Sequence, residues 1–439
     1  MPVRILVDQS GYDLLNVGDA AMLQSCVQHL GALWPGADIA VICHDGQRLE
    51  QYCPGTTQVP AALGGPGSVP GLPEKVRLGF GQVHKMVRPY TSLSRGRSRH
   101  QQAPRSLTGA IRWADVVVAS GGGYLNDTWW WHGFGVLSVL DLAQRLGRPT
   151  AMFGQGIGPL THPALRRQAR RVLPRLHVLG LREGVAGLPL ARSLGVAAAC
   201  VVVTGDDALD LAGSAATAPS APTTPSAAIG SGAGDALGVN VRVTGYAGVD
   251  GPVASRVGTT LARAVARWHA TVIGLPVSRY EPDSDLASIR SLWPGRLPAG
   301  SIAEDLSTPL ELAAAAARCR AVVTGSYHAA VFALAAGVPT VCLSSSDYYN
   351  AKFAGIADLF PDATEVVPLG GRDLERRLED AIGRAWGADE RTRRSARERA
   401  TTLAEASKGL YQRFADLVNE GSAAPGLPAL RDEIDRRRA

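Results

Sequence analysis

The sequence predicts an α/β protein built from two Rossmann-like, doubly wound domains that face a cleft. Short β-branched runs alternate with helical segments along nearly all of its 439 residues. A Ser/Thr/Ala/Pro/Gly tract over 211–236, which has no hydrophobic period, interrupts this alternation near the middle. A chain of this length can bury two cores. Open α/β sheets bind ligands at the carboxyl ends of their strands, so two such domains place a substrate between them.

The expected elements follow in order along the chain. We expect strands in the first half at 3–8, 38–42, 115–119, 150–153, 177–181 and 200–204, and in the second half at 237–243, 270–275, 321–324, 339–343 and 365–368. Helical patterns include 259–269, 309–319 and a long charged segment over 390–419. The predicted organisation is a first domain over 1–210 with a basic insertion at about 58–112, a linker over 211–236, a second domain over 237–390, and C-terminal helices and tail over 391–439.

Composition excludes several classes of protein. No apolar run reaches the roughly 20 residues that span a bilayer, and the N-terminus begins a strand instead of a signal peptide, so a cytoplasmic location is expected. The cysteines lack the close Cys/His spacing of a metal site, which predicts reduced core thiols and no metal. They are Cys26, Cys43, Cys53, Cys200, Cys319 and Cys342.

One segment within the insertion is strongly basic. Residues 75–112 contain nine Lys or Arg and no Asp or Glu. The segment lacks the aromatic interleaving of a base-stacking surface, so nucleic acid is not an expected partner. Contact with the inner face of a membrane or with an anionic acceptor fits this composition, and so does a plain solvated insertion.

Glycine and polar residues follow successive strands of the first half, where backbones must come close to a ligand. No dinucleotide fingerprint and no Walker lysine accompanies them, which disfavours NAD and ATP. Asp19 is placed to cap a helix over 20–30. The candidate substrate-binding residues here are Asn16, Gly18, Asp19, Gly122, Gly123, Asn126, Gln155 and Gly156, and Arg182 follows the fifth strand.

Three adjacent tryptophans, Trp129 to Trp131, follow one of these turns. Adjacent side chains cannot all face one core. An aromatic surface for a ligand such as a sugar ring and a wall of interdomain packing are both open interpretations.

In the second half, a strand over 321–324 meets a helix whose expected N-cap is Ser326. Tyr327 and His328 then fall in the first helical turn, where free N–H groups and the helix dipole favour an anion such as phosphate or carboxylate. A surface histidine after a common N-capping serine fits the same residues.

Taken together, these motifs resemble the polysaccharide pyruvyl transferase family. The resemblance rests on Asn16-x-Gly18-Asp19, Ser-Gly-Gly-Gly at 120–123, Gly-Gln-Gly-Ile-Gly-Pro at 154–159, Leu-Arg-Glu at 181–183, Asp206-Asp207, the run 238–242 with Asn240 and Arg242, and His328 with Gly-Val-Pro at 337–339 and Lys352. It implies a GT-B-like fold and transfer of a pyruvyl group from phosphoenolpyruvate to sugar hydroxyls as a cyclic ketal. Phosphoenolpyruvate is then a co-substrate, with no other cofactor, and the acceptor is a nucleotide- or lipid-linked saccharide.

This chemistry requires an acid and cations. His328 is the expected general acid, Arg182 the clamp for a carboxylate or phosphate, and Lys352 the group that neutralises the leaving phosphate. Asp206 and Asp19 would orient acceptor hydroxyls or cap helices, with capping favoured for Asp19.

One departure from the family pattern bears on the donor. Family members commonly carry Arg-Leu-His where this chain has Ser326-Tyr327-His328, so one cation is missing unless Arg242 or Arg279 replaces it. The alternatives are a GT-B glycosyltransferase that uses a nucleotide sugar, a divergent member that acts on a small natural product, and a saccharide-binding protein without catalysis.

Overall fold

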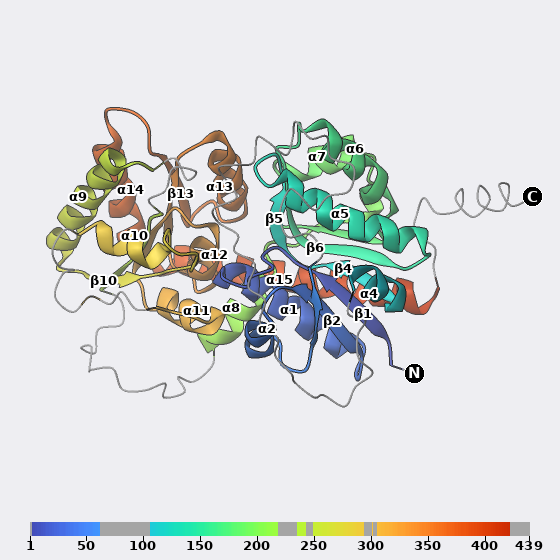
Figure 1. Cartoon of the computed structure of the whole chain (residues 1–439). Coiled ribbons are helices and arrows are strands. Elements are labelled where there is room, and N and C mark those ends of the chain that lie inside the picture. Colours follow the sequence, from blue (N-terminus) through green and yellow to red (C-terminus); the bar gives the residue numbers. More distant parts are fainter. Residues whose placement is uncertain are drawn as a thin grey trace, which may run out of the picture. The chain divides into compact units, whose positions relative to one another are not determined.

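The computed structural model describes residues 2–61, 106–217, 235–242, 249–293, 301 and 305–421. The chain forms two compact units (Figure 1). Unit 1 comprises Met1–Leu14, Met22–Thr204 and Ala406–Ala439, and unit 2 comprises Leu15–Ala21 and Gly205–Glu405. The first turn of one helix near the N-terminus therefore belongs to unit 2, and the C-terminal helix contributes to both units.

Unit 1 is built on a parallel sheet with the strand order β3-β2-β1-β4-β6-β7-β8, to which β5 adds by pairing with β6. Most of its strand residues are apolar and buried, as expected where helices cover both faces of a parallel sheet. They are β1 (Arg4–Asp8), β2 (Asp38–Cys43), β3 (Thr57–Pro60), β4 (Val116–Ala119), β5 (Gly122–Leu125), β6 (Thr150–Ile157), β7 (Val178–Leu181) and β8 (Val201–Val203).

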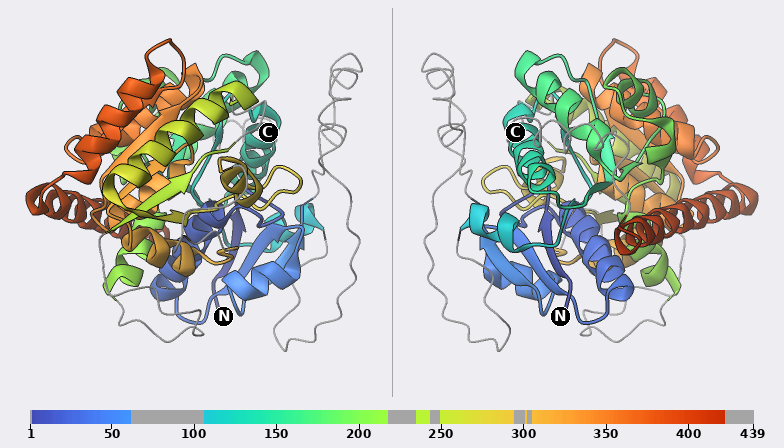
Figure 2. Two further views of the ribbon diagram at one scale, coloured as in Figure 1. Left: turned by 90° about the vertical axis from the view of Figure 1, so that its left-hand side faces the viewer. Right: turned by 90° about the vertical axis from the view of Figure 1, so that its right-hand side faces the viewer.

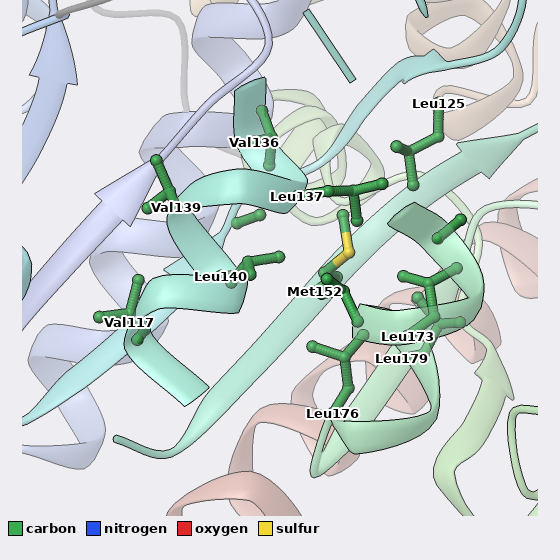
Figure 3. Close-up of a cluster of buried hydrophobic side chains, with 14 of the residues drawn as sticks. Val117, Leu125, Val136, Leu137, Val139, Leu140, Met152, Leu173, Leu176 and Leu179 are labelled. Carbon is green, nitrogen blue, oxygen red and sulfur yellow. The ribbon is translucent and has the colours of Figure 1, made fainter. Parts of the chain in front are cut away.

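The helices of unit 1 pack against this sheet through apolar stripes. In α5 (Trp130–Arg145), Leu137 and Leu140 lie against Met152 of β6 and Leu179 of β7, all fully buried (Figure 3). The helix stops where Gly147 adopts a φ of 71°, which glycine tolerates without strain. The other helices with residues in this unit are α1 (Val17–Leu33), α2 (Gly46–Tyr52), α4 (Leu107–Trp113), α6 (Pro163–Val172) and α7 (Gly187–Ser193).

Unit 2 contains a five-stranded parallel sheet with the order β10-β9-β11-β12-β13. One face packs against α9 (Gly251–Trp268) and α14 (Leu374–Trp386), and α9 lies in front of the sheet in the left view of Figure 2. The strands are β9 (Ala236–Asn240), β10 (Thr271–Gly274), β11 (Ala321–Thr324), β12 (Thr340–Ser344) and β13 (Thr364–Pro368). The remaining helices are α8 (Ala208–Thr217), α10 (Asp285–Ser291), α11 (Pro309–Ala317), α12 (Tyr327–Ala335), α13 (Asp347–Leu359) and α15 (Glu390–Asn419).

The predicted parallel α/β organisation is confirmed, and α15 has the predicted limits 390–419. All six cysteines are buried and free. None of the described helices is long and apolar enough to cross a membrane.

Two segments differ from their predictions. The tract over 211–236 begins as helix, because Leu211 and Ala212 are buried in α8, which runs to Thr217. The insertion over 58–112 begins in β3 and ends in α4, which carries Arg112. The other eight basic residues of 75–112 and the tract beyond 217 up to 234 lie outside the described residues.

Candidate functional site

In unit 2, His328 lies in the first turn of α12, as predicted, and the entire helix is buried. Ser326 occupies the N-cap position, but its side chain makes no capping hydrogen bond. Its backbone N–H donates instead to Thr324 Oγ1 at 2.8 Å, which fixes the turn between β11 and α12. The first-turn N–H groups of α12 therefore receive no acceptor from the capping side chain, and such groups attract anions.

The His328 ring faces a carboxylate. Its Nε2 lies 3.7 Å from Asp206 Oδ2, a distance that permits an ion pair when the imidazole is protonated. Among the described residues, this buried Nε2 has no hydrogen-bond partner. The other oxygen, Asp206 Oδ1, accepts a hydrogen bond from the N–H of Ala208 at 2.9 Å, where α8 begins. Asp206 thus binds the N-terminus of α8 with one carboxylate oxygen and faces His328 of α12 with the other.

Gly18 packs directly against the other side of the imidazole. A Cβ at position 18 would lie 2.0 Å from Cγ and 2.2 Å from Nδ1 of His328, so no larger residue fits without displacing the ring. The turn is fixed by Asn16, whose Oδ1 accepts from the N–H groups of Gly18 at 3.0 Å and Asp19 at 3.2 Å. The prediction that Asp19 caps this helix is wrong, because α1 begins at Val17 and Asp19 lies in its first turn.

A short loop holds the Asn16 turn in place. The N–H of Val17 donates to the carbonyl of Val277 at 2.9 Å, and the N–H of Arg279 donates to the carbonyl of Leu15 at 2.8 Å. Together these bonds form an antiparallel bridge between Asn16 and Ser278. A shift of the loop over 277–279 would therefore move the turn that contacts His328.

Asp285, which the sequence did not single out, anchors that loop. Its buried Oδ2 accepts hydrogen bonds from the N–H groups of Val277 and Ser278, both at 2.9 Å, and from Asn240 Nδ2 at 2.8 Å. Its Oδ1 accepts from Arg242 Nε at 2.7 Å. Nothing in the local sequence distinguishes Asp285 from a first-turn helix residue, because its partners come from distant segments.

The two arginines considered as substitutes for the missing family arginine are both ion-paired. Arg242 contacts Asp285, and Arg279 Nη2 lies 2.8 Å from Asp305. Both therefore already balance a carboxylate of unit 2. Asn240 and Arg242 are brought together, but around Asp285.

Lys352 is surrounded by aromatic rings. Its Nζ lies 5.1 Å from the ring centre of Tyr327, 5.6 Å from that of Tyr348 and 5.9 Å from that of Tyr349, all within cation–π range. The Tyr327 ring also meets the His328 ring edge-on, with centroids 5.8 Å apart. Tyr327 therefore contacts both the imidazole and the ammonium group.

In unit 1, Arg182 follows β7 and is almost fully buried. A Cβ at Gly123 would lie 2.5 Å from Arg182 Nη2, and one at Gly156 would lie 2.3 Å from Nε. Two predicted glycines thus leave the space that the guanidinium occupies. Gln155 accepts from the Arg182 N–H through its backbone carbonyl at 3.0 Å and donates from Nε2 to the carbonyl of Ser120 at 2.7 Å.

Gly122, the first residue of β5, and Asn126, which follows β5, are the remaining predicted residues of unit 1. A Cβ at Gly122 would lie 2.4 Å from the Tyr124 ring. Asn126 Nδ2 donates to the carbonyl of Gly123 at 2.6 Å. The glycines predicted here are thus required by close approach of side chains within unit 1.

A second group of buried polar residues in unit 1 was not predicted. Asp8, at the carboxyl end of β1, accepts from the N–H of Gln9 at 2.9 Å and from the hydroxyl of Tyr12 at 3.0 Å. Burial raises the pKa of Asp8 to about 7, which the two hydrogen bonds only partly oppose. Burial likewise lowers the pKa of His132 to about 4, although its Nε2 lies 3.1 Å from the carbonyl of Gln9.

The described residues contain no group of three or more His, Cys, Asp or Glu side chains arranged to hold a metal ion. The predicted residues form two groups. Unit 2 brings together Asn16, Gly18, Asp19, Asp206, Ser326, Tyr327, His328 and Lys352, with Asn240 and Arg242 around Asp285. Unit 1 brings together Gly122, Gly123, Asn126, Gln155, Gly156 and Arg182.

Replacing Gly18 with alanine should displace the His328 ring, because the new Cβ overlaps it. We expect a loss of about 1–3 kcal/mol in the free energy of unfolding, measured in urea, and shifted His328 ring signals in NMR spectra. The matched control is Gly31→Ala, on the same helix, where a Cβ meets nothing within 4 Å. Unchanged ring signals in Gly18→Ala would contradict the packing described.

The raised pKa of Asp8 makes stability depend on pH. The folded protein binds more protons at Asp8 than the unfolded chain between about pH 4 and pH 7, so the free energy of unfolding should fall as pH rises through this window. The slope from this group is at most about 1.4 kcal/mol per pH unit. In Asp8→Asn this component should disappear, so the stability difference between wild type and variant should change steadily from pH 4 to pH 7. A difference that is constant with pH would exclude a titrating Asp8.

Solved structures with a similar fold are numerous, at low sequence identity. A crystal structure titled as the glycotransferase of kitacinnamycin has a TM-score of 0.55 at 12% identity, covering 96% of this chain and 99% of that one. The MnaA–UDP co-structure from S. aureus has a TM-score of 0.58 at 12% identity, covering 95% and 97%. A putative UDP-N-acetylglucosamine 2-epimerase from Listeria monocytogenes has a TM-score of 0.57 at 8% identity, covering 96% and 98%. These likenesses establish a GT-B-type fold with two Rossmann-like units.

No curated protein sequence matches this chain significantly. The family model of the polysaccharide pyruvyl transferases matches residues 16–347, from the turn that contacts His328 to the start of α13. Because this match covers most of the chain, the protein is a transferase that belongs to the polysaccharide pyruvyl transferase family.

Proposed function

We propose that this transferase moves a pyruvyl group from phosphoenolpyruvate onto two hydroxyls of a saccharide as a cyclic ketal, with no further cofactor. The observation that carries the proposal is the setting of His328 in unit 2. Its ring is held between Gly18 and Asp206 at the N-terminus of a buried helix, where an anion is favoured.

In the proposed reaction, His328 donates a proton to the methylene carbon of phosphoenolpyruvate while a sugar hydroxyl attacks the adjacent carbon. The proton of that hydroxyl returns to the histidine. The second hydroxyl then attacks the same carbon, the bond to phosphate breaks, and the second proton leaves with the phosphate. The products are the ketal and inorganic phosphate.

The two histidine nitrogens would have different roles. Nε2 is buried and faces Asp206, so the carboxylate can orient the ring through this nitrogen. Nδ1 packs against Gly18, so Nε2 would also be the nitrogen that exchanges the proton with substrate. General acid catalysis by a positioned histidine typically contributes about 10²- to 10⁴-fold in rate.

The cations would bind the anionic groups of the donor. Lys352, held over the Tyr327 ring, would neutralise charge on the departing phosphate. Arg182 in unit 1 would bind a carboxylate or phosphate through its planar guanidinium. With Ser326 in place of the family arginine, we propose that Lys352 supplies the cation at this end of α12.

The proposed acceptor is a nucleotide- or lipid-linked saccharide, as in biosynthesis of cell-envelope or extracellular polysaccharide. A lipid-linked acceptor would place the enzyme in the cytoplasm at the inner face of the membrane. The basic segment 75–112 suits such an anionic surface. The second candidate is a glycosyltransferase, since two of the solved structures of similar fold carry glycosyltransferase titles.

The test combines binding and turnover. We expect phosphoenolpyruvate to raise the melting temperature more than UDP-sugars do. With a panel of saccharide acceptors, we expect release of phosphate and a product that carries the mass of a pyruvate ketal. His328→Ala should lower kcat by at least about 100-fold. The control is His269→Asn, at an exposed helix C-cap of the same unit. Stabilisation by UDP-sugars alone, without phosphate release, would favour the glycosyltransferase.

A double-mutant cycle can measure the coupling between Tyr327 and Lys352. Tyr327→Leu and Lys352→Met should each raise the KM for phosphoenolpyruvate, and their combination should cost less than the sum. A coupling of about 0.5–2 kcal/mol is expected for an ammonium–aromatic contact. Tyr327→Phe keeps the ring and should behave as wild type. Strict additivity of the two changes would show that Lys352 acts without Tyr327.

A further inference from the structure

The three consecutive tryptophans of unit 1 have three different environments. The Trp130 ring stacks on His162 with centroids 4.3 Å apart and an interplanar angle of 9°. Trp131 packs edge-on against His132 at 5.7 Å. Trp129 remains 40% exposed, and it is the only exposed tryptophan among the described residues. The Trp129 ring also contacts Trp131 edge-on, with centroids 6.3 Å apart.

The segment that carries Trp129 is fixed by hydrogen bonds. Asn126, itself buried, accepts from the Trp129 N–H at 2.9 Å through Oδ1. The carboxylate of Asp127 accepts from the N–H groups of Thr161 and His162, both at 2.8 Å. The exposed indole therefore sits on a rigid turn, and a preorganised surface loses little entropy when a ligand binds.

The turn lies at the edge of the sheet where ligands bind in α/β folds. It follows β5 directly and leads into α5 (Figure 1). Asn126 connects it to Arg182, because Asn126 Nδ2 donates to the carbonyl of Gly123 and Gly123 lies against the guanidinium. An exposed aromatic plane and a buried cation thus follow two strands, β5 and β7, that both pair with β6.

We infer that Trp129 is a stacking subsite for a pyranose ring of the acceptor saccharide. The flat indole face matches the C–H face of a sugar ring, and a single exposed aromatic surface is too small for a lipid chain. A carbohydrate is favoured over a nucleobase because the polar groups of this turn, the Asn126 amide and the Asp127 carboxylate, are already occupied within the protein. The inference rests on the proposed function for the identity of the acceptor.

Binding can be tested without the donor. Saturation-transfer NMR with methyl glucoside, methyl galactoside, methyl mannoside and uridine as probes should show transfer from the full-length protein to at least one glycoside. Trp129→Ala should abolish that transfer, and Trp129→Phe should retain part of it. The matched control is Leu146→Ala, which removes an apolar side chain that is also 40% exposed, beside the C-terminus of the same helix.

Kinetics then separate this role from a structural one. In Trp129→Ala, the KM for the saccharide should rise by about tenfold, with kcat and the KM for phosphoenolpyruvate unchanged. If glycoside binding depends on Trp129 but no pyruvyl transfer occurs, the subsite stands and the proposed function fails. If pyruvyl transfer occurs and Trp129→Ala leaves glycoside binding and KM unchanged, the subsite is overturned. The subsite is also overturned if Trp129→Ala reduces saturation transfer to uridine but not to the glycosides, or if Leu146→Ala reduces transfer to the glycosides as much as Trp129→Ala does. Absence of transfer to every glycoside in the wild type overturns it too.

Discussion

The close packing of the Gly18 backbone against the His328 ring is the constraint around which unit 2 is organised. The imidazole occupies the space that any side chain at position 18 would need. The ring can keep its orientation only if the Asn16–Asp19 turn stays in place, and that turn depends on a loop that Asp285 holds through buried hydrogen bonds. Such bonds are costly to break where water cannot replace them. A histidine at one strand end thus depends on a carboxylate that never touches it.

Packing in unit 2 places a cation near the departure from the family pattern. Ser326 cannot supply the positive charge that an arginine would carry. Tyr327 instead presents a ring to Lys352, and Tyr348 and Tyr349, which come shortly before Lys352 in the chain, present two more. Aromatic faces stabilise a cation by the charge distribution of their π-systems. The start of α12 and the residues of α13 around Lys352, which are separated in sequence by a strand, therefore form one cluster.

In unit 1 as well, glycines leave the space that a functional side chain occupies. Gly123 and Gly156 come from different strands, and each lacks the side chain that would collide with the Arg182 guanidinium. Their closeness to a cation gives a physical reason for the glycine runs that goes beyond tight turns. The buried Asp8 of β1 and His132 of α5 show that this unit also carries ionisable groups whose pKa values are shifted by burial.

The sequence alone determined the doubly wound α/β class, most strands and helices, and the family, because hydrophobic period and the order of motifs are local properties of the chain. It also placed His328 in a first helical turn. It misplaced the start of α1, since Asn16 and Asp19 are both good capping residues and only the fold selects between them. It missed Asp285 and the pairing of Asp206 with His328, and it placed no contact between Tyr327 and Lys352. Those contacts join residues far apart in the chain, so only tertiary packing, which brings strand ends and helix starts together, could decide them.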